Sequence, residues 1–531
     1  MCGIALIAGP DPCLPTFRRM IESLAPRGEA EEILRTDDLL AGVQRLRIVD
    51  RDRAVQPWVS ADGRWVLCYN GEVFNYRELQ AELTGLGHRL CSDSDTEVVL
   101  EAFLEWGEDA VSHLRGEFAF AIVDRSTGRV YLARDPLGVK PLYWSRRGGL
   151  HVASEVKALV PVGARIAEVP PGQHGWADPG TGPSLAPYCD LLRLGADQPP
   201  LEDPGEAVKL VRAALEDSIR VRVDTDLTVG VILSGGVDSS LVLLHVREMH
   251  PDCVAFTIGA PGSEDLSYAR RLTAELGVPH EVIELHPREI RLRDIREAIR
   301  IGELTEYGDI INAVVSVPLF RRIHDLGVKV VLSGDGSDEL FGGYPMYYRA
   351  GPQQARRLFL HKISNLCRTE LQRLDRTSMG HGVELRVPFL DRCLVELAMR
   401  MPLDFKMRGG QEKWIIREAF ADLLPDYVRQ RPKDMMSYSS GLHERARLFK
   451  PVYPWLHRSL RYDLLAPVRR DFDTVLNRCD HDLDRAIIDS EARLDYNVFE
   501  RARDLAGAAR WNLLPAKKAL RGPGPDSTMS R

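Results

Sequence analysis

The stretch VGVILSGGVDSS, residues 229–240, decides the fold of the second half of the chain. It opens with apolar residues that do not alternate with polar ones, which predicts a strand covered on both faces. A serine-glycine turn follows, and a helix begins directly after it in VDSSLVLL. A turn between a strand and a helix N-terminus gathers backbone N–H groups that bind an anion. The sequence therefore predicts an anion site at the carboxyl end of this strand.

The side chains of this turn indicate which anion it binds. The phosphate loop of pattern G-x-x-x-x-G-K-[ST] carries a lysine, whereas this turn carries Asp238. A carboxylate suits a magnesium ion on pyrophosphate, and the pattern SGGxDS is typical of enzymes that cleave ATP between its α and β phosphates to leave an adenylate. The predicted pyrophosphate loop consists of Leu233, Ser234, Gly235, Gly236, Asp238, Ser239 and Ser240. A purely structural glycine turn is the alternative.

A second loop of the same kind follows another apolar strand in VVLSGDGSDELFGGY, residues 330–344. Apolar strands alternate with amphipathic helices in this half of the chain, which predicts an α/β doubly wound parallel sheet with a helical C-terminal part. Because the carboxyl ends of parallel strands meet at one edge, we expect Asp238 and Asp338 to hold Mg²⁺ together. Ser333 and Gly334 would extend the pyrophosphate site. A solvated acidic loop is the alternative.

The first part of the chain has a different pattern, with short strands separated by turns. The predicted strands are GIALIAG, LLAGVQRLRIVD, WVLCYNGEVF, EFAFAIVD, RVYLARD, PLYWS and LHVAS. Together with helices near residues 76–86 and 96–106, they predict an α+β domain built on antiparallel sheets.

The length of the chain, 531 residues, exceeds what a single hydrophobic core supports. Proline and glycine are frequent between Gly172 and Gly205, which is the composition of a linker. The predicted organisation is a first domain at 1–190, a linker at 191–204, a second domain at 205–512 and a disordered tail at 513–531.

Composition excludes several classes of function. A net charge of -7 gives no electrostatic reason to expect nucleic acid or an anionic membrane as a partner. No segment has the pattern of an export signal or a membrane span, so we expect a cytoplasmic protein. The nine cysteines are scattered, without C-x-x-C or zinc-type spacing, which argues against a disulfide framework and a structural metal.

The chain begins MCGIALIAG, with a thiol directly after the initiator methionine. Removal of that methionine would leave Cys2 with a free α-amine of pKa about 8, a general base for its own thiol. Arg47 could clamp a substrate carboxylate, Asn70 and Gly71 could form an oxyanion hole at a turn between strands, and Asp95 could receive an ammonium group. A simple hairpin turn at Asn70-Gly71 and a helix N-cap at Asp95 are the alternatives.

Eight motifs of the first domain carry a resemblance to a known family. They are MCGI, RLRIVD, AVQPW, YNGEVFNYREL, SDSDTE, FAFAIVD, ARDPLGVKPLYW and ASEVKAL. In this order they resemble the glutaminase domain of class II glutamine amidotransferases of the asparagine synthetase type. The resemblance implies an N-terminal nucleophile fold that releases ammonia from glutamine through a thioester on Cys2.

The same resemblance assigns roles to the residues around Cys2. Arg47 would hold the glutamine carboxylate and Glu72 and Asp95 its amine, while Asn70 and Gly71 would bind the oxyanion. One loop departs from the family pattern. Where the family usually has His-Arg-Gly-Pro-Asp, this chain reads Pro26-Arg27-Gly28-Glu29-Ala30. We expect that change to alter the packing beside Cys2 and the affinity for glutamine.

The resemblance continues through about residue 450, into the synthetase domain of asparagine synthetases and the related β-lactam synthetases. It rests on SGGVDSS, SGDGSDE, HGVELRVPFLD and RPKDMMSYSSG. By this analogy Lys433 stabilises charge as an acyl-adenylate forms and collapses, Glu384 lies beside the acceptor, and Asp335 has a catalytic role. The implied substrates are glutamine, ATP and a carboxylic acid, with Mg²⁺ as cofactor. A homodimer is left open.

The predicted function is an ATP-dependent amidotransferase that converts L-aspartate to L-asparagine. The segment 303–320 favours a less polar acceptor, because it has no basic residue and should line the acceptor pocket. Its apolar residues are Ile310, Ile311, Val314, Val315 and Val317. An ordinary core helix facing away from the site explains them equally well. Intramolecular β-lactam formation, a free-standing glutaminase and a scaffold are the rival functions.

Overall fold

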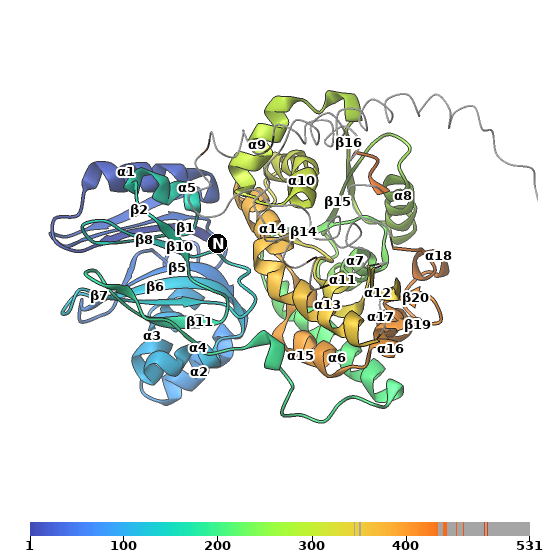
Figure 1. The fold of residues 1–531 in the computed structure, drawn as a ribbon, viewed down its shortest axis with the longest axis horizontal. Helices are drawn as coiled ribbons and strands as arrows, with labels where there is room; N and C mark the ends of the chain where they lie inside the picture. The colour runs from blue at the N-terminus through green and yellow to red at the C-terminus, as the bar shows by residue number, and fades with distance from the viewer. Residues whose placement is uncertain are drawn as a thin grey trace, which may run out of the picture.

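The chain folds into two lobes that meet where its N-terminus lies (Figure 1). The computed structural model describes residues 1–344, 346–349, 352–433 and 439–442, and the single positions 453, 460, 483 and 486. The remainder of the predicted helical C-terminal part up to 512, and the predicted tail at 513–531, lie outside the described residues. The domain boundaries expected from the sequence stay a prediction.

The first lobe consists of two stacked antiparallel sheets. One has the order β10 (Ile166–Glu168), β8 (Tyr143–Arg146), β9 (Leu150–Ala153), β1 (Cys2–Ala8), β3 (Leu39–Arg45) and β2 (Ala30–Arg35). The other has the order β12 (Gly182–Pro183), β11 (Gln173–Asp178), β7 (Arg129–Arg134), β6 (Gly116–Asp124), β5 (Trp65–Val73) and β4 (Trp58–Val59), with β13 (Ala186–Pro187) beside β11. The predicted antiparallel α+β domain is confirmed.

Helices cover the outer face of each sheet in this lobe (Figure 1). Those on the first sheet are α1 (Leu14–Ser23) and α5 (Val156–Leu159). Those on the second are α2 (Tyr76–Gly85), α3 (Asp95–Trp106) and α4 (Ala110–His113).

The alternation of side chains along β1 explains where the thiol of Cys2 lies. Ala5 and Ile7 pack against the outer helices α1 and α5. Cys2, Ile4 and Leu6 belong to the other face, in the apolar layer between the two sheets. Successive side chains of a strand point to opposite faces, so the register of β1 directs the thiol between the sheets, toward β5.

The second lobe contains the predicted parallel sheet. Its strand order is β16 (His280–Glu284), β15 (Val254–Gly259), β14 (Val229–Ile232), β17 (Val330–Leu332) and β18 (Glu384–Arg386), and every neighbouring pair is parallel. The longer helices around it are α6 (Pro204–Arg222), α7 (Val237–Met249), α8 (Glu264–Leu276), α9 (Leu292–Gly302), α10 (Tyr307–Asp325), α13 (Pro352–Asn365), α14 (Glu370–Met379) and α15 (Arg392–Arg400). The α/β prediction is confirmed.

Short elements fill the loops of this lobe. They are α11 (Ser337–Phe341), α12 (Met346–Arg349), α16 (Leu403–Lys406), α17 (Trp414–Ala419), α18 (Asp426–Arg429) and the hairpin of β19 (Met407–Arg408) and β20 (Gln411–Glu412). Within the part of the chain that the structure describes, no helix is long and apolar enough to cross a membrane.

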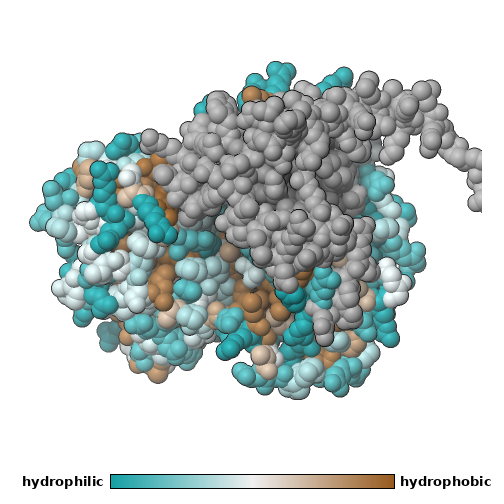
Figure 2. Space-filling view, in the orientation of Figure 1, coloured by the Kyte–Doolittle hydropathy of each residue, from teal (hydrophilic) through white to brown (hydrophobic). Residues whose placement is uncertain are grey.

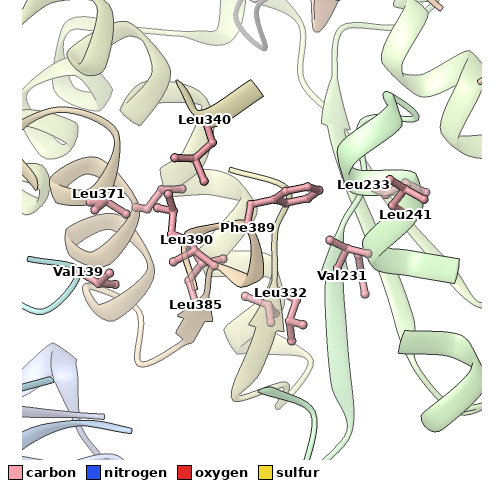
Figure 3. Packing of buried hydrophobic residues seen from close by; sticks show 14 of the residues in the cluster. Val139, Val231, Leu233, Leu241, Leu332, Leu340, Leu371, Leu385, Phe389 and Leu390 are labelled. Atoms are coloured by element: carbon pink, nitrogen blue, oxygen red, sulfur yellow. The ribbon is translucent and has the colours of Figure 1, made fainter. Parts of the chain in front are cut away.

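One apolar cluster extends from the second lobe into the first. Figure 3 shows Val139 of the first lobe beside Leu371, Leu385 and Leu390 of the second. Met1 belongs to the same cluster. On the face shown in Figure 2 the described surface is mostly hydrophilic, with apolar residues in small groups, some of them at the junction of the lobes. The two lobes therefore share a buried core.

Replacing Phe256 by alanine should destabilise the second lobe. Phe256 is fully buried in β15, and its ring covers Gly230 of β14, where an added Cβ would lie 2.9 Å from the ring. Loss of a buried phenylalanine costs about 3–5 kcal/mol of the free energy of unfolding. Urea denaturation followed by circular dichroism measures it, with Leu292→Ala as the control because Leu292 is 42% exposed. Equal shifts in both variants would contradict the packing described.

Candidate active site

Cys2 is the first residue of β1 and is buried, with 5% of its surface exposed. Its backbone N–H donates to Asn70 Oδ1 at 3.0 Å, and Gln56 Nε2 lies 3.7 Å from its Sγ. Burial raises the pKa of the thiol, while the N-terminal ammonium group and Arg45 partly oppose that shift. The thiol thus sits in an apolar layer with polar groups at one end.

Asn70 and Gly71 lie in the middle of β5 and not at a turn, which corrects the expectation from the sequence. Both pair with β6, opposite Ala119 and Phe118. Gly71 is needed for close packing, because an added Cβ would lie 2.5 Å from the carbonyl oxygen of Glu117. Asn70 Nδ2 is buried and makes no hydrogen bond within the described residues. A buried, unused N–H donor beside a thiol suits an oxyanion that forms only during reaction.

Glu72 and Asp95 place two buried carboxylates near this thiol. Asp95 is the first residue of α3, and its Oδ2 accepts from Tyr69 Oη at 2.6 Å and from the Val73 N–H at 3.1 Å. Burial raises the pKa of both carboxyl groups, and each is further affected by neighbouring charges. Ser94 is the N-cap of α3, so Asp95 is not needed for that role. Two adjacent buried carboxylates favour a bound cation.

The structure does not bring Arg47 to Cys2, because its side chain is exposed beyond the end of β3. Arg45 occupies the place beside Cys2 that was expected for Arg47. It pairs directly with Cys2 in the register of β3 and β1 and is 3% exposed. Its Nη2 donates to the carbonyl oxygens of Asp50 and Arg51 at 3.2 and 3.1 Å, which holds the guanidinium in place.

Glu384 lies on β18 at the junction of the lobes, 1% exposed. Its Oε2 accepts from the ammonium group of Met1 at 2.9 Å, and its Oε1 accepts from Arg386 Nε at 2.6 Å. These cations lower the pKa of Glu384 to about 2 although burial alone would raise it. Arg386 Nη2 is 3.5 Å from Glu72 Oε2. β18 therefore reaches the pocket of Cys2 from the second lobe.

The second site is a cleft at the carboxyl edge of the parallel sheet. It is lined by Ser234, Gly236, Val237, Asp238, Asp265, Lys413, Arg417, Arg431, Pro432, Lys433 and Ser439. Gly235 has φ +70°, and an added Cβ would lie 2.5 Å from Tyr268, so the turn requires glycine. The Oγ atoms of Ser234 and Ser239 lie 3.1 Å apart and close the turn at the start of α7.

Two aspartates and two lysines meet in this cleft. Lys413 Nζ lies 2.5 Å from both Asp238 Oδ2 and Asp338 Oδ1, and Lys433 Nζ lies 2.6 Å from Asp338 Oδ2. The lysines lower the pKa of Asp338 to about 2. Ser337 Oγ donates to Asp238 Oδ1 at 2.6 Å. The four side chains form a compact site for a polyanion.

The aspartate pair fits a magnesium ion that is also bound by phosphate oxygens. Carboxylate oxygens suit Mg²⁺, which commonly takes one or two carboxylates and completes its shell with phosphate and water. Asp238 and Asp338 supply that number. The described residues contain no group of three or more His, Cys, Asp or Glu side chains that could hold a metal ion. A magnesium ion in this cleft would therefore need phosphate oxygens or water as its other ligands.

The other residues predicted for this site lie around the cleft. Leu233 belongs to the core, and its carbonyl oxygen accepts from Thr257 Oγ1. Ser240 is buried in α7. Ser333 donates its N–H to the carbonyl of Arg386 on β18, and Gly334 packs against Asp238, where an added Cβ would lie 2.7 Å from the aspartate Cβ.

Asp335 points away from the lysines and pairs with Arg373 of α14 at 3.3 Å. Arg373 is 5% exposed, lies 3.5 Å from Ser316 Oγ on α10 and 3.9 Å from Asp309, and its Nε has no hydrogen bond among the described residues. A buried guanidinium whose Nε makes no hydrogen bond within the described part of the chain and only a long 3.9 Å ion pair with Asp309 is a candidate partner for a further carboxylate.

Sequence reasoning missed Lys413, Arg431, Asp265 and Arg373. Lys413 has φ +56°, a conformation that costs free energy in a lysine and that here directs its side chain between the two aspartates. Arg431 donates to the Ser234 carbonyl and to Asp265, both at 2.7 Å. Arg431 had a signal, because it adjoins Lys433 in the motif RPKDMMSYSSG, whereas Lys413, Asp265 and Arg373 lie in none of the motifs.

Comparison with protein families agrees with this geometry. A glutamine amidotransferase domain matches residues 1–171, and asparagine synthase matches residues 210–358 and 349–511. The chain belongs to the asparagine synthase family. It is a glutamine-hydrolysing carbon–nitrogen ligase with an N-terminal nucleophile domain, as expected from the motifs.

Several curated members of the asparagine synthase family are similar over most of their length. Asparagine synthetase B of Escherichia coli K12 is 35% identical over 431 residues, 77% of this chain and 76% of the relative. Asparagine synthetase 2 of Oryza sativa subsp. japonica is 35% identical over 83% of this chain and 78% of the relative. A probable asparagine synthetase of Schizosaccharomyces pombe is 32% identical over 83% and 85%. All three are described as glutamine-hydrolysing.

Replacing Lys413 by methionine should abolish pyrophosphate release. The change leaves Asp238 and Asp338 without their shared cation and removes a charge that would face the phosphates. Loss of one such group costs about 100-fold or more in rate. Pyrophosphate release measures the effect, glutaminase activity should persist, and Lys209→Met on the exposed face of α6 is the control. A rate within threefold of the unmodified protein would contradict this role.

Proposed function

We propose that this enzyme adenylates a carboxylate with ATP, most favourably L-aspartate, and amidates it with ammonia released from glutamine at Cys2. The products would be L-asparagine, AMP, pyrophosphate and glutamate. The observation that carries the proposal is the position of Met1, which joins Cys2 to Glu384 across the lobe junction through a 2.9 Å ion pair. Cys2 is thereby joined through buried groups to a strand of the second lobe.

The glutamine half of the reaction needs a nucleophile, an oxyanion hole and a grip on the amino acid. We propose that removal of Met1 frees the amine of Cys2 as the general base. Asn70 Nδ2, which has no other described partner, would bind the oxyanion together with the Gly71 N–H. Glu72 and Asp95 would hold the α-ammonium group of glutamine. Arg45 would hold its carboxylate, replacing Arg47 in that role.

The ATP half of the reaction concerns the cleft around Asp238. The turn of Ser234 to Ser239 would bind pyrophosphate, and Lys413 and Lys433 would neutralise charge as the acyl-adenylate forms and collapses. Mg²⁺, held by Asp238 and Asp338, would neutralise the phosphates further.

Ammonia would pass from one half-site to the other along the space that Met1 fills. Met1 is 3% exposed and belongs to the apolar cluster shared by the lobes. Its removal would leave a buried space between Cys2 and Glu384, closed to bulk water. Glu384 would then be the first polar group that ammonia meets on leaving the thioester, and Asp335 would lie at the acceptor end.

The residues in and beside α10 support aspartate as the acceptor over a less polar acid. The apolar residues of α10 are core residues: Ile310, Val314, Val315 and Val317 are at most 4% exposed. They therefore support the core-helix interpretation of the segment 303–320. The cation missing from the segment 303–320 would be supplied by Arg373 from the neighbouring α14, with the acidic groups of Asp309 and Asp335 beside it. Such a cluster would bind an amino acid, which carries both a carboxylate and an ammonium group.

The rival functions leave one of the two sites without a use. Intramolecular β-lactam formation would need no glutamine pocket, and a free-standing glutaminase would need neither the paired aspartates nor their lysines. A cytoplasmic location remains part of the proposal, and the oligomeric state stays open.

Cys2→Ala should lose glutamine-dependent synthesis completely and keep ammonia-dependent synthesis near the level of the unmodified enzyme. The thiol serves only glutamine hydrolysis, whereas the ATP cleft lies in the other lobe. Asparagine formation with either nitrogen source measures the division, and Cys13→Ala, at an exposed cysteine, is the control. Equal loss with both nitrogen sources would refute the division of labour.

L-Aspartate should support pyrophosphate release, whereas succinate and 3-phenylpropanoate should not, because neither carries the α-ammonium group that the acidic cluster would bind. Arg373→Met should raise the KM for aspartate about tenfold or more, since it removes a buried charged donor. The KM for ATP should change less than threefold. Pyrophosphate release with the apolar acid alone would exclude aspartate as the acceptor.

A further inference from the structure

The loop that departs from the family pattern connects the nucleophile to the second lobe. Arg27 lies in this loop and is 1% exposed. Its Nε donates to the backbone carbonyl oxygen of Cys2 at 3.1 Å. Its Nη1 donates to Glu155 Oε1 at 2.6 Å and to Asp375 Oδ2 at 2.9 Å, and its Nη2 donates to Asp375 Oδ1 at 3.3 Å. A residue of the second lobe is therefore one side chain away from Cys2.

Asp375 is held rigidly in a buried network. It lies on α14, and both its side chain and that of Arg27 are 1% exposed. Its neighbour Arg376 donates to it at 3.0 Å and also pairs with Glu303 at 3.3 Å and with the hydroxyl of Tyr143 at 3.0 Å. The carboxylate thus has a fixed position, and it lowers the free energy of the buried Arg27 cation.

The geometry of the guanidinium turns this fixed position into a constraint on Cys2. A guanidinium is planar, so two N–H groups bound to one carboxylate define its plane and its direction. Asp375 binds both terminal nitrogens of Arg27, whereas Glu155 binds one. The third donor, Nε, then points at the Cys2 carbonyl. Without Asp375, Arg27 would keep one anchor and could rotate about it.

The same loop also contains an ion pair that only joins the lobes. Glu29 accepts from Lys329 Nζ at 2.9 Å, and the two side chains are 40% and 29% exposed. This pair does not touch Cys2. It therefore provides a matched comparison with the pair of Arg27 and Asp375.

We propose that Asp375 is a positioning residue for glutamine hydrolysis: acting through Arg27, it fixes the backbone of Cys2, so the nucleophile is correctly placed only when the second lobe is docked. The inference rests on the proposed role of Cys2. Arg27 is one of the two residues of this loop that match the usual pattern His-Arg-Gly-Pro-Asp, and Asp375 of the second lobe orients it.

The test is Asp375→Asn in the full-length enzyme, which keeps the shape of the side chain and removes its charge. The kcat of glutamine-dependent asparagine synthesis and of glutamine hydrolysis should fall about 10- to 100-fold, as expected for a misplaced nucleophile. The KM for glutamine and the rate of ammonia-dependent synthesis should each change less than threefold. Asp375→Glu, which keeps the carboxylate, should recover part of the lost kcat.

A direct readout of Cys2 accompanies the kinetics. A glutamine analogue with an electrophilic δ-carbon labels the thiol, and mass spectrometry gives the rate. Labelling should slow in Asp375→Asn by the same factor as kcat. Lys329→Gln, which breaks the other ion pair of the loop, should leave labelling, kcat and KM within about twofold of the unmodified enzyme.

Three outcomes would overturn the inference. The first is an unchanged labelling rate in Asp375→Asn. The second is an equal loss of glutamine-dependent and ammonia-dependent synthesis in both Asp375→Asn and Asp375→Glu, which would mean that the residue serves the fold as a whole. The third is an equal effect of Lys329→Gln, which would mean that any docking contact suffices. Retention of glutamine-dependent synthesis in Cys2→Ala would instead refute the proposed function itself.

Discussion

Charged side chains buried between the two lobes form ion pairs across the junction, and these pairs fix the position of one lobe relative to the other. The pairs that cross it include Met1 with Glu384, Arg27 with Asp375, Glu72 with Arg386 and Glu117 with Arg222. Breaking one buried pair leaves an uncompensated charge and costs several kcal/mol. The lobes are therefore held in one relative position, in which each lobe supplies the counter-charges for buried charged groups of the other.

The first lobe docks against the edge of the parallel sheet, which brings β18 beside the surroundings of Cys2. β18 is the edge strand, and an uncovered edge strand exposes unpaired backbone groups. Its residues Glu384 and Arg386 face the pocket of Cys2, while the carbonyl of Arg386 accepts from Ser333, where the second loop of the ATP site begins. A strand of three residues thus contacts both halves of the enzyme.

The sequence predicted what depends on local pattern. Both sheet types, the turn at Gly235 and the aspartates of the ATP cleft follow from periodicity and motif. It did not predict what depends on register between distant segments. Gly71 suggested a turn because Asn-Gly usually makes one, yet tight packing against β6 explains the glycine. Arg45 and Arg47 are indistinguishable by pattern, and only the pairing of β3 with β1 selects Arg45. Arg373 approaches from a distant helix with no local signal.

The burial of Met1 sets an order of events in the making of the enzyme. An aminopeptidase needs a free, extended chain end, but the Met1 ammonium group is sequestered between the lobes and bound to Glu384. Once the lobes have docked, the terminus is out of reach. Domains fold in turn as the chain emerges from the ribosome, so the proposed removal of Met1 would have to take place before the second lobe is complete. A chain that misses this interval would fold normally and stay unable to hydrolyse glutamine.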